Sequence, residues 1–171
     1  EIIVMEDKVA TWQQAIVGLD KKVVSYSAAG TVLDILQAEP QRVAIFSRTA
    51  GSALLFANEN GSGLIEDLNI TAGGTPEVRS FAGEEITAVV RLDANSWMIA
   101  LPDRLVRFNY ATNTIVELAT SITVDALAYD PAIGALFAAN GNNLYTIDPN
   151  SGIMTNTLTV GIQIGHILPL R

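Results

Sequence analysis

The second half of the sequence repeats itself, and this repeat restricts the fold more than any other feature. Residues 86–121 and 122–160 both begin with Ile-Thr and continue into an alternating apolar run that ends in Asp. Each then has a short apolar stretch, a polar loop, a second stretch (LVRFN or LYTID), a turn and a last alternating stretch. Repeats of roughly 40 residues with this order are typical of four-stranded units. The sequence therefore predicts an all-β chain built from four-stranded antiparallel units.

The same order continues into the first half of the chain. It predicts one domain or domain fragment of 171 residues, with approximate unit boundaries at 8–41, 42–85, 86–121 and 122–160. Tight turns rich in Gly, Asn, Asp and Pro separate the strands. Turns are expected at 28–30, 72–74, 111–113 and 149–152.

Both chain ends have the pattern of partial units. Residues 1–14 match the second and third strands of a unit, and residues 15–20 match a following strand. Residues 161–170 match the first strand of a further unit. If these pieces meet, strands from the two termini would complete one sheet. The alternative, which the sequence leaves open, is that the chain is a fragment of a larger protein with the same repeat.

Burial decides how such units assemble. One small four-stranded sheet cannot cover both of its apolar faces, so repeated sheets must pack against one another. Sheets stacked face to face around an axis form a β-propeller, which buries those faces and leaves few exposed edges. A β-sandwich explains the short alternating strands equally well, but it does not explain one strand order recurring at a near-constant period. We therefore expect a β-propeller, or a propeller fragment, of about four blades.

Two stretches also carry a family resemblance. Residues 105–118 (LVRFNYATNTIVEL) and 144–161 (LYTIDPNSGIMTNTLTVG) resemble the repeat of surface-layer-type, YVTN-like β-propellers. In that repeat a strand ending in Asp leads through a Thr-Asn or Ser-Gly turn into an alternating Val/Thr strand. The resemblance extends over residues 86–161 and implies a propeller. It implies no single activity, because the family includes adhesins, scaffolds, ligand binders and some enzymes.

Composition limits the partners. The chain has 18 acidic and 10 basic residues, a net charge of −8 and no cluster of basic residues, so neither nucleic acid nor anionic lipid is an expected partner. No apolar run approaches the roughly 18 residues of a membrane-spanning helix, so membrane insertion is not expected. Cysteine is absent, which excludes disulfides and thiolate sites. We favour an extracellular or cell-envelope location, and a cytoplasmic one remains open.

These features favour a non-catalytic binding or scaffold module that presents a propeller face to a protein or glycan partner, or to the rest of its own chain. The one histidine, His166, has neither metal-ligand nor catalytic-triad spacing around it. One alternative is a hydrolase- or lactonase-like propeller enzyme that uses acidic loop residues and calcium. Another is a structural fragment of a larger propeller. No cofactor is expected other than calcium.

The loops between second and third strands and the links between blades lie at one face, the usual ligand face of a propeller. The ligand-binding residues expected there are Asp103, Arg104, Glu59, Asn60, Asn142 and Lys21, with Glu39, Glu84 and Glu85 nearby. Because Asp103 and Arg104 follow Pro102 at a loop tip, we expect both side chains to be free to bind a partner. The opposite face would carry Asp93, Asn95, Asn113, Asp130 and Asn150.

Overall fold

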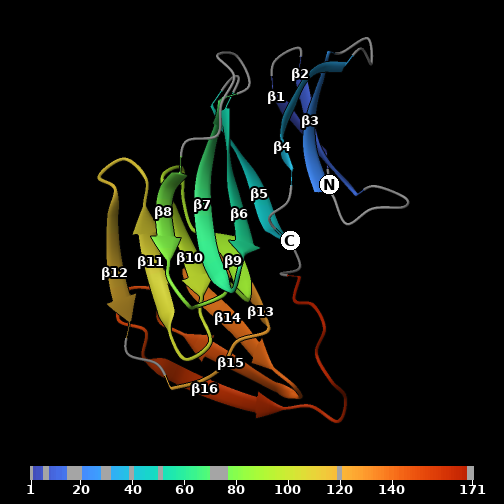
Figure 1. Cartoon of the computed structure of the whole chain (residues 1–171). Coiled ribbons are helices and arrows are strands. Elements are labelled where there is room, and N and C mark those ends of the chain that lie inside the picture. Colours follow the sequence, from blue (N-terminus) through green and yellow to red (C-terminus); the bar gives the residue numbers. More distant parts are fainter. Residues whose placement is uncertain are drawn as a thin grey trace. The chain divides into compact units, whose positions relative to one another are not determined.

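The described part of the chain consists entirely of strands and their connections. The computed structural model describes residues 2–5, 8–14, 21–27, 32–38, 41–49, 52–69, 77–118 and 121–168. These residues form four antiparallel sheets of four strands each and contain no helix (Figure 1). The prediction of an all-β chain built from four-stranded antiparallel units is confirmed. No helix that could cross a membrane occurs among the residues described.

Strand order within each sheet follows chain order, as expected of a propeller blade. The first sheet contains β1 (Ile2–Met5), β2 (Lys8–Gln14), β3 (Lys21–Ser27) and β4 (Val32–Ala38). The second contains β5 (Gln41–Thr49), β6 (Ser52–Glu59), β7 (Ser62–Asn69) and β8 (Glu77–Phe81). The third contains β9 (Ala88–Arg91), β10 (Ser96–Ala100), β11 (Leu105–Asn109) and β12 (Thr114–Leu118). The fourth contains β13 (Ala126–Asp130), β14 (Ala135–Asn140), β15 (Asn143–Ile147) and β16 (Met154–Thr159).

The chain divides into two compact units, Glu1–Gly83 and Glu84–Arg171, with two sheets each. In the first unit, β6 is the most deeply buried of the strands whose side chains are described. Leu54, Leu55 and Phe56 are all fully buried, so both faces of this strand are covered. The ring of Phe56 meets that of Phe46 edge to face, with centroids 5.7 Å apart.

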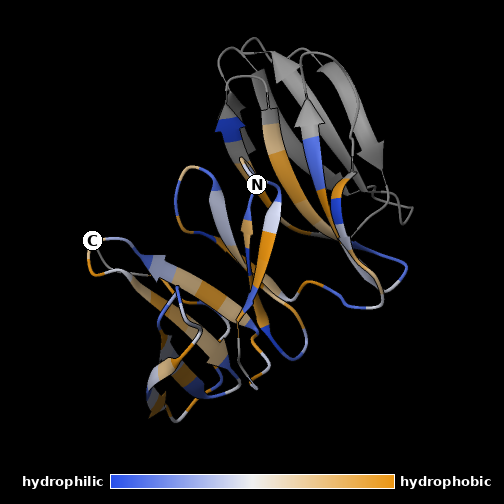
Figure 2. Cartoon of the chain, turned by 90° about the vertical axis from the view of Figure 1, so that its left-hand side faces the viewer, coloured by the Kyte–Doolittle hydropathy of each residue, from blue (hydrophilic) through white to orange (hydrophobic). Residues whose placement is uncertain are grey.

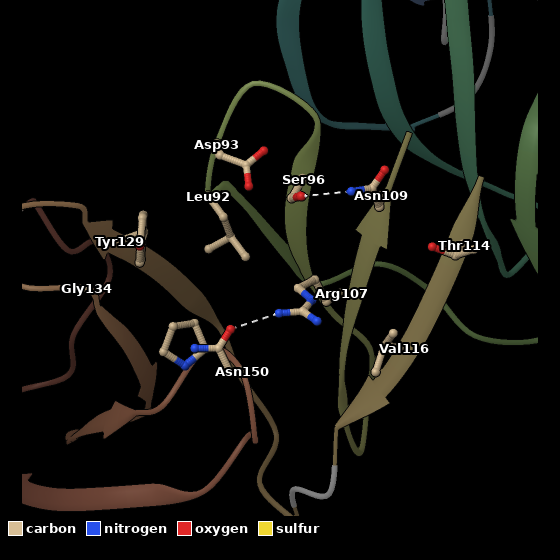
Figure 3. A pocket seen from close by; sticks show the side chains of 11 residues that line it. Leu92, Asp93, Ser96, Arg107, Asn109, Thr114, Val116, Tyr129, Gly134 and Asn150 are labelled. Atoms are coloured by element: carbon tan, nitrogen blue, oxygen red, sulfur yellow. Dashed lines mark hydrogen bonds between the residues drawn. The ribbon is translucent and has the colours of Figure 1, made fainter. Parts of the chain in front are cut away.

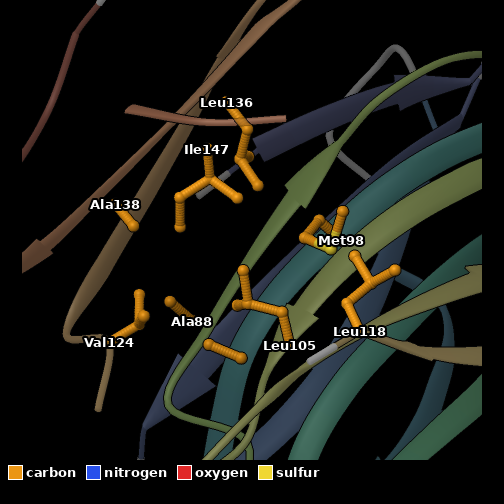
Figure 4. Packing of buried hydrophobic residues seen from close by; sticks show 9 residues of the cluster. Ala88, Met98, Leu105, Leu118, Val124, Leu136, Ala138 and Ile147 are labelled. Carbon is orange, nitrogen blue, oxygen red and sulfur yellow. The ribbon is translucent and has the colours of Figure 1, made fainter. Parts of the chain in front are cut away.

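The core of the second unit lies between its two sheets (Figure 4). Alternate residues of a strand point to opposite faces, and β10 (SWMIA) is apolar at four positions, so it is buried on both sides. The third sheet contributes Ala88, Met98, Ala100, Leu105 and Leu118 to the cluster between the sheets, the fourth contributes Leu136, Ala138 and Ile147, and Val124 comes from the link between them. This apolar interface holds the two sheets together.

Many of the polar residues lie in turns, where Figure 2 shows hydrophilic segments next to hydrophobic ones. Three of them begin with an aspartate whose Oδ1 accepts a backbone N–H two residues later: Asp93 from Asn95 (2.7 Å), Asp130 from Ala132 (2.9 Å) and Asp148 from Asn150 (2.8 Å). The turns predicted at 111–113 and 149–152 are confirmed. Those predicted at 28–30 and 72–74, and the strand predicted at 15–20, fall outside the described residues.

Both predictions for the chain ends are wrong. Residues 2–14 contain the first and second strands of the first sheet, not the second and third, because β3 and β4 follow them in the same sheet. Residues 161–168 form no strand, although Ile164 N–H donates to the carbonyl of Gly141 (2.7 Å). The first sheet is therefore completed by its own four strands rather than by a strand from each terminus.

Candidate functional site

A pocket of about 370 Å³ opens in the second unit, beside the β9–β10 and β13–β14 turns (Figure 3). The third sheet supplies Leu92, Asp93, Ser96, Arg107, Asn109, Thr114 and Val116, and the fourth supplies Tyr129, Gly134, Pro149 and Asn150. Both walls therefore come from one compact unit.

Strand alternation explains why these side chains face one another. On β11, Leu105 belongs to the core between the sheets, so Arg107 and Asn109, two and four residues later, point to the same face. Their neighbours across the ladder, Met98 opposite Arg107 and Ser96 opposite Asn109, share that face. The pocket is thus the polar continuation of the apolar interface toward one end of the sheets.

Arg107 and Asn150 join the two walls. Nη1 of Arg107 donates to Oδ1 of Asn150, 3.0 Å away, and Figure 3 shows this bond crossing the pocket. The backbone N–H of Asn150 in turn donates to Oδ1 of Asp148 at 2.8 Å. That hydrogen bond, together with one from the Ser151 hydroxyl, holds the pKa of Asp148 below its usual range. The ionised Asp148 therefore fixes the turn that presents Asn150 to Arg107.

The floor of the pocket is polar and internally bonded. Nδ2 of Asn109 donates to Oγ of Ser96 at 3.3 Å, and Ser96 is only 7% exposed. Oδ1 of Asn109 accepts the backbone N–H of Thr112 at 3.1 Å and its hydroxyl at 3.2 Å. These bonds hold the Asn109 amide in one orientation and engage one of its two N–H donors and its acceptor oxygen.

Asp93 lies at the rim of the pocket, in a loop whose backbone carbonyls are bound by Arg91. Arg91 donates from Nε to the Asp93 carbonyl (2.8 Å) and from Nη2 to the Ala94 carbonyl (3.1 Å). Its guanidinium carbon also lies 5.6 Å from the centroid of the Trp97 ring, a cation–π distance. The loop thus places one carboxylate at the pocket mouth. The described lining of the pocket combines one cationic fork, one carboxylate and several neutral polar groups.

The opposite end of the unit carries three of the six residues that the sequence assigned to ligand binding, Asp103, Arg104 and Asn142. Asp103 is exposed, as expected, but Arg104 is not free, and that expectation is wrong. Its guanidinium pairs with both carboxylate oxygens of Glu84, with Nη2 2.8 Å from Oε2, and Nη1 lies 3.1 Å from Oδ1 of Asp103. Its Nε lies 3.7 Å from Oε1 of Glu117. Glu84 raises the pKa of Arg104 further above its already high value. The loop places Arg104 within reach of acidic residues that are distant in sequence.

The remaining predicted residues lie in both units. Asn142 is exposed in the β14–β15 turn, and Thr123 connects that turn to the loop of Asp103 and Arg104. The Thr123 hydroxyl donates to the Pro102 carbonyl (3.1 Å), and Asn140 Nδ2 donates to the Thr123 carbonyl (2.7 Å). Asp103, Arg104 and Asn142 thus share one end of the second unit.

Three predicted residues belong to the first unit. Glu59 and Asn60 are exposed at the β6–β7 turn, and Lys21 begins β3. Among the described residues, no three His, Asp or Glu side chains come together as metal ligands.

The sequence prediction did not include Arg107, Asn109 and Ser96, and it assigned Asp93 and Asn150 to the face opposite the expected ligand face. A signal for the missed residues does exist. In LVRFN, Arg107 and Asn109 occupy the same alternating positions as the apolar Leu105, which places polar groups on a core-facing side. The sequence prediction left these residues out because it considered only loops as ligand positions.

Comparison with known proteins identifies the fold. No family model and no curated protein matches the sequence. Among solved structures, the chain is similar to the dihydro-heme d1 dehydrogenase NirN in complex with DHE (TM-score 0.72, 15% identity, 96% of this chain and 37% of that one). It is also similar to Saccharomyces cerevisiae Sqt1 (TM-score 0.70, 8% identity, 97% of this chain and 52% of that one). A third similar structure is the β-propeller domain of Cps50 (Swd1) from Myceliophteria thermophila (TM-score 0.65, 15% identity, 95% of this chain and 55% of that one). The chain therefore has the fold of a β-propeller fragment, and it spans from about a third to just over half the length of these proteins.

Proposed function

We propose that the chain is part of a β-propeller binding module that holds a protein partner at the end of the second unit where the pocket opens. The observation that carries this proposal is the pocket itself. It brings side chains from two sheets, above all Arg107 and Asn150, to one accessible depression. A depression lined by a few directed polar groups is the usual form of a recognition site.

Several features support a protein as the partner. The pocket is mostly polar, and its volume of about 370 Å³ lies at the lower end of the range of ligand sites, which suits a short polar segment of a larger partner. Exposed apolar side chains lie in the same unit near the β13–β14 and β15–β16 turns, among them Ile133 (68% exposed) and Ile153 (63%). Such residues beside a polar pocket supply the apolar contacts that protein interfaces use.

Three finer predictions are parts of this proposal. The surface-layer-type repeat and an extracellular or cell-envelope location both agree with a module that displays a binding face. Asp103 and Asn142 of the second unit stay a prediction as ligand-binding positions outside the pocket, and Glu59 of the first unit stays a separate one. Binding of a glycan in place of a protein is one of the outcomes that the tests below distinguish.

Peptides selected from a displayed random library test the proposal. We expect the selected peptides to compete with one another and to lose at least tenfold in affinity when Val116→Trp fills the pocket mouth. Val116 is 44% exposed on the outer strand β12, so a larger ring fits there without disturbing the core. Isothermal titration calorimetry gives the dissociation constants.

Leu158→Trp is the matched control, because Leu158 is 54% exposed on the outer strand β16, which contributes no residue to the pocket. Peptides should bind this variant as tightly as the unchanged chain. The proposal is wrong if binding is insensitive to Val116→Trp. It is also wrong if the chain selects no peptide but binds members of a glycan array.

A further inference from the structure

We infer that the pocket recognises a single carboxylate, carried by an acidic side chain or the C-terminus of a peptide and bound by the guanidinium of Arg107. This inference rests on the proposed function and names the group that the pocket binds. Arg107 projects from β11 into the pocket, where Figure 3 shows it facing the β15–β16 turn.

Most N–H donors of the Arg107 guanidinium are available to a ligand. Arginine carries five N–H donors in a planar fork. Among the described residues, the guanidinium of Arg107 makes one hydrogen bond, from Nη1 to the neutral amide of Asn150 (3.0 Å), and no carboxylate forms an ion pair with it. Asn150 therefore orients the fork without neutralising its charge.

The other two described arginines of this unit differ from Arg107 in this respect. Arg104 is paired with both oxygens of Glu84 and lies within ion-pair distance of Asp103 and Glu117. Arg91 donates to two backbone carbonyls of its own loop and stacks over Trp97. Each of these two has a structural role within the chain, whereas Arg107 has its positive charge uncompensated at a cavity.

The rest of the lining favours one monoanionic group. A carboxylate matches a planar guanidinium with two parallel hydrogen bonds, so a single arginine is sufficient. A phosphate dianion needs more positive charge, and the described lining supplies no second cation while Asp93 adds a negative charge at the rim. Asp93 also disfavours a second acidic group and can accept an N–H from the main chain beside the bound carboxylate. The lining is thus suited to an acidic residue within a peptide.

Side-chain NMR of the guanidinium Nε–H signals, with acetyl-Gly-Glu-Gly-amide as the probe, tests the inference on the full chain. We expect this tripeptide to shift the Arg107 signal saturably, while acetyl-Gly-Gln-Gly-amide leaves it unchanged. Arg107→Lys assigns the signal and should weaken binding only in part, because lysine keeps the charge but loses the fork. In Arg107→Gln, the backbone amides of the pocket should show no saturable shift.

Asn156→Asp is the matched control, because it makes the same change in net charge on β16 and keeps an acceptor for the Thr157 N–H. This variant should bind the Glu tripeptide as the unchanged chain does. Free glutarate separates the two sources of a carboxylate: binding tighter than that of the tripeptide would overturn the peptide assignment. If acetyl-Gly-phosphoSer-Gly-amide binds more tightly than the Glu tripeptide, the assignment of a carboxylate as the bound group is overturned.

Equal shifts by the Glu and Gln tripeptides, or unchanged binding by Arg107→Gln, would also overturn the inference. The proposed function has a separate test. If displayed peptides depend on Val116 while the two tripeptides behave alike, the chain binds peptides at the pocket without recognising a carboxylate. If no displayed peptide depends on Val116, the proposed function itself is lost.

Discussion

Carboxylates from three separate segments surround Arg104. Glu84 comes from the link before β9, Asp103 from the β10–β11 loop and Glu117 from β12. The Arg104 side chain is 25% exposed and that of Glu84 is 29% exposed, so this pair is partly shielded from water. A two-pronged guanidinium–carboxylate pair in such a setting is stronger than an ordinary surface ion pair. The group therefore stabilises the way the Glu84 segment lies against the third sheet.

Arg104→Ala should destabilise the chain by about 1–2 kcal/mol, because it removes the charge-assisted hydrogen bonds to Glu84. Urea denaturation of the variant measures this change in the free energy of unfolding. Arg104→Lys should recover less than half of the loss, since an ammonium cannot make the two-pronged contact. A change smaller than about 0.3 kcal/mol in the alanine variant would mean that the network contributes nothing to stability.

Arg104 and Arg107 show which part of residue function can be predicted from a sequence. Their positions were predictable, one in a loop and the other at a core-facing strand position. Their partners were not, because Glu84 lies 20 residues from Arg104 and Asn150 lies 43 residues from Arg107 in the chain. The loop arginine is paired, and the strand arginine is the one with unused donors. Pairing over such separations follows from sheet packing, which local patterns do not contain.

Among the elements, the β15–β16 connection has the most direct bearing on the pocket. Asp148 accepts the Asn150 N–H at 2.8 Å, its backbone carbonyl accepts the Gly152 N–H at 2.9 Å, and its own N–H donates to the Ile153 carbonyl at 2.9 Å. The ladder changes register between Thr146 and Ile147. The aspartate thus organises the turn that carries Asn150 to Arg107.

Asp148→Asn should lower the free energy of unfolding at neutral pH. This destabilisation should become smaller in acid. The pKa of the folded-state carboxyl lies below the value of about 3.9 expected in the unfolded chain. Its ionised form therefore stabilises the fold above that pH, and this stabilisation disappears as the pH falls through the folded-state pKa. Denaturation midpoints of the two proteins, compared from pH 7 down to pH 2, should converge at the acidic end. A gap of constant size across that range would contradict this role for the carboxylate.

Element order was predictable from the repeat, and the ends of the chain were not. From β5 onward, the strands follow the pattern of apolar alternation and turn residues in the sequence. Residues 1–14 were placed one strand too late because a short segment of alternating residues fits several positions of a blade equally well. Residues 161–168 resemble a strand but have no neighbouring strand to pair with among the described residues. Strand formation depends on a partner as well as on composition.

At the scale of the whole molecule, the two compact units have the same internal plan. Each unit is a pair of four-stranded sheets, so the repeat accounts for the fold. The repeat does not account for the pocket, because Arg107 and Asn109 are substitutions within it: the matching stretch LYTID has Thr146 and Asp148 at those positions. Function in such a chain belongs to the places where one repeat departs from the others.

A map of backbone amide shifts, recorded by NMR while a library-selected peptide is added to the full chain, tests the central claim most directly. The two ends of the second unit are separated by the length of its strands, so the shifts will distinguish between them. We predict that the largest shifts cluster at 92–96, 107–116, 129–134 and 149–150. Largest shifts at 102–104 and 141–143 would place the binding surface at the opposite end of the unit and contradict the claim.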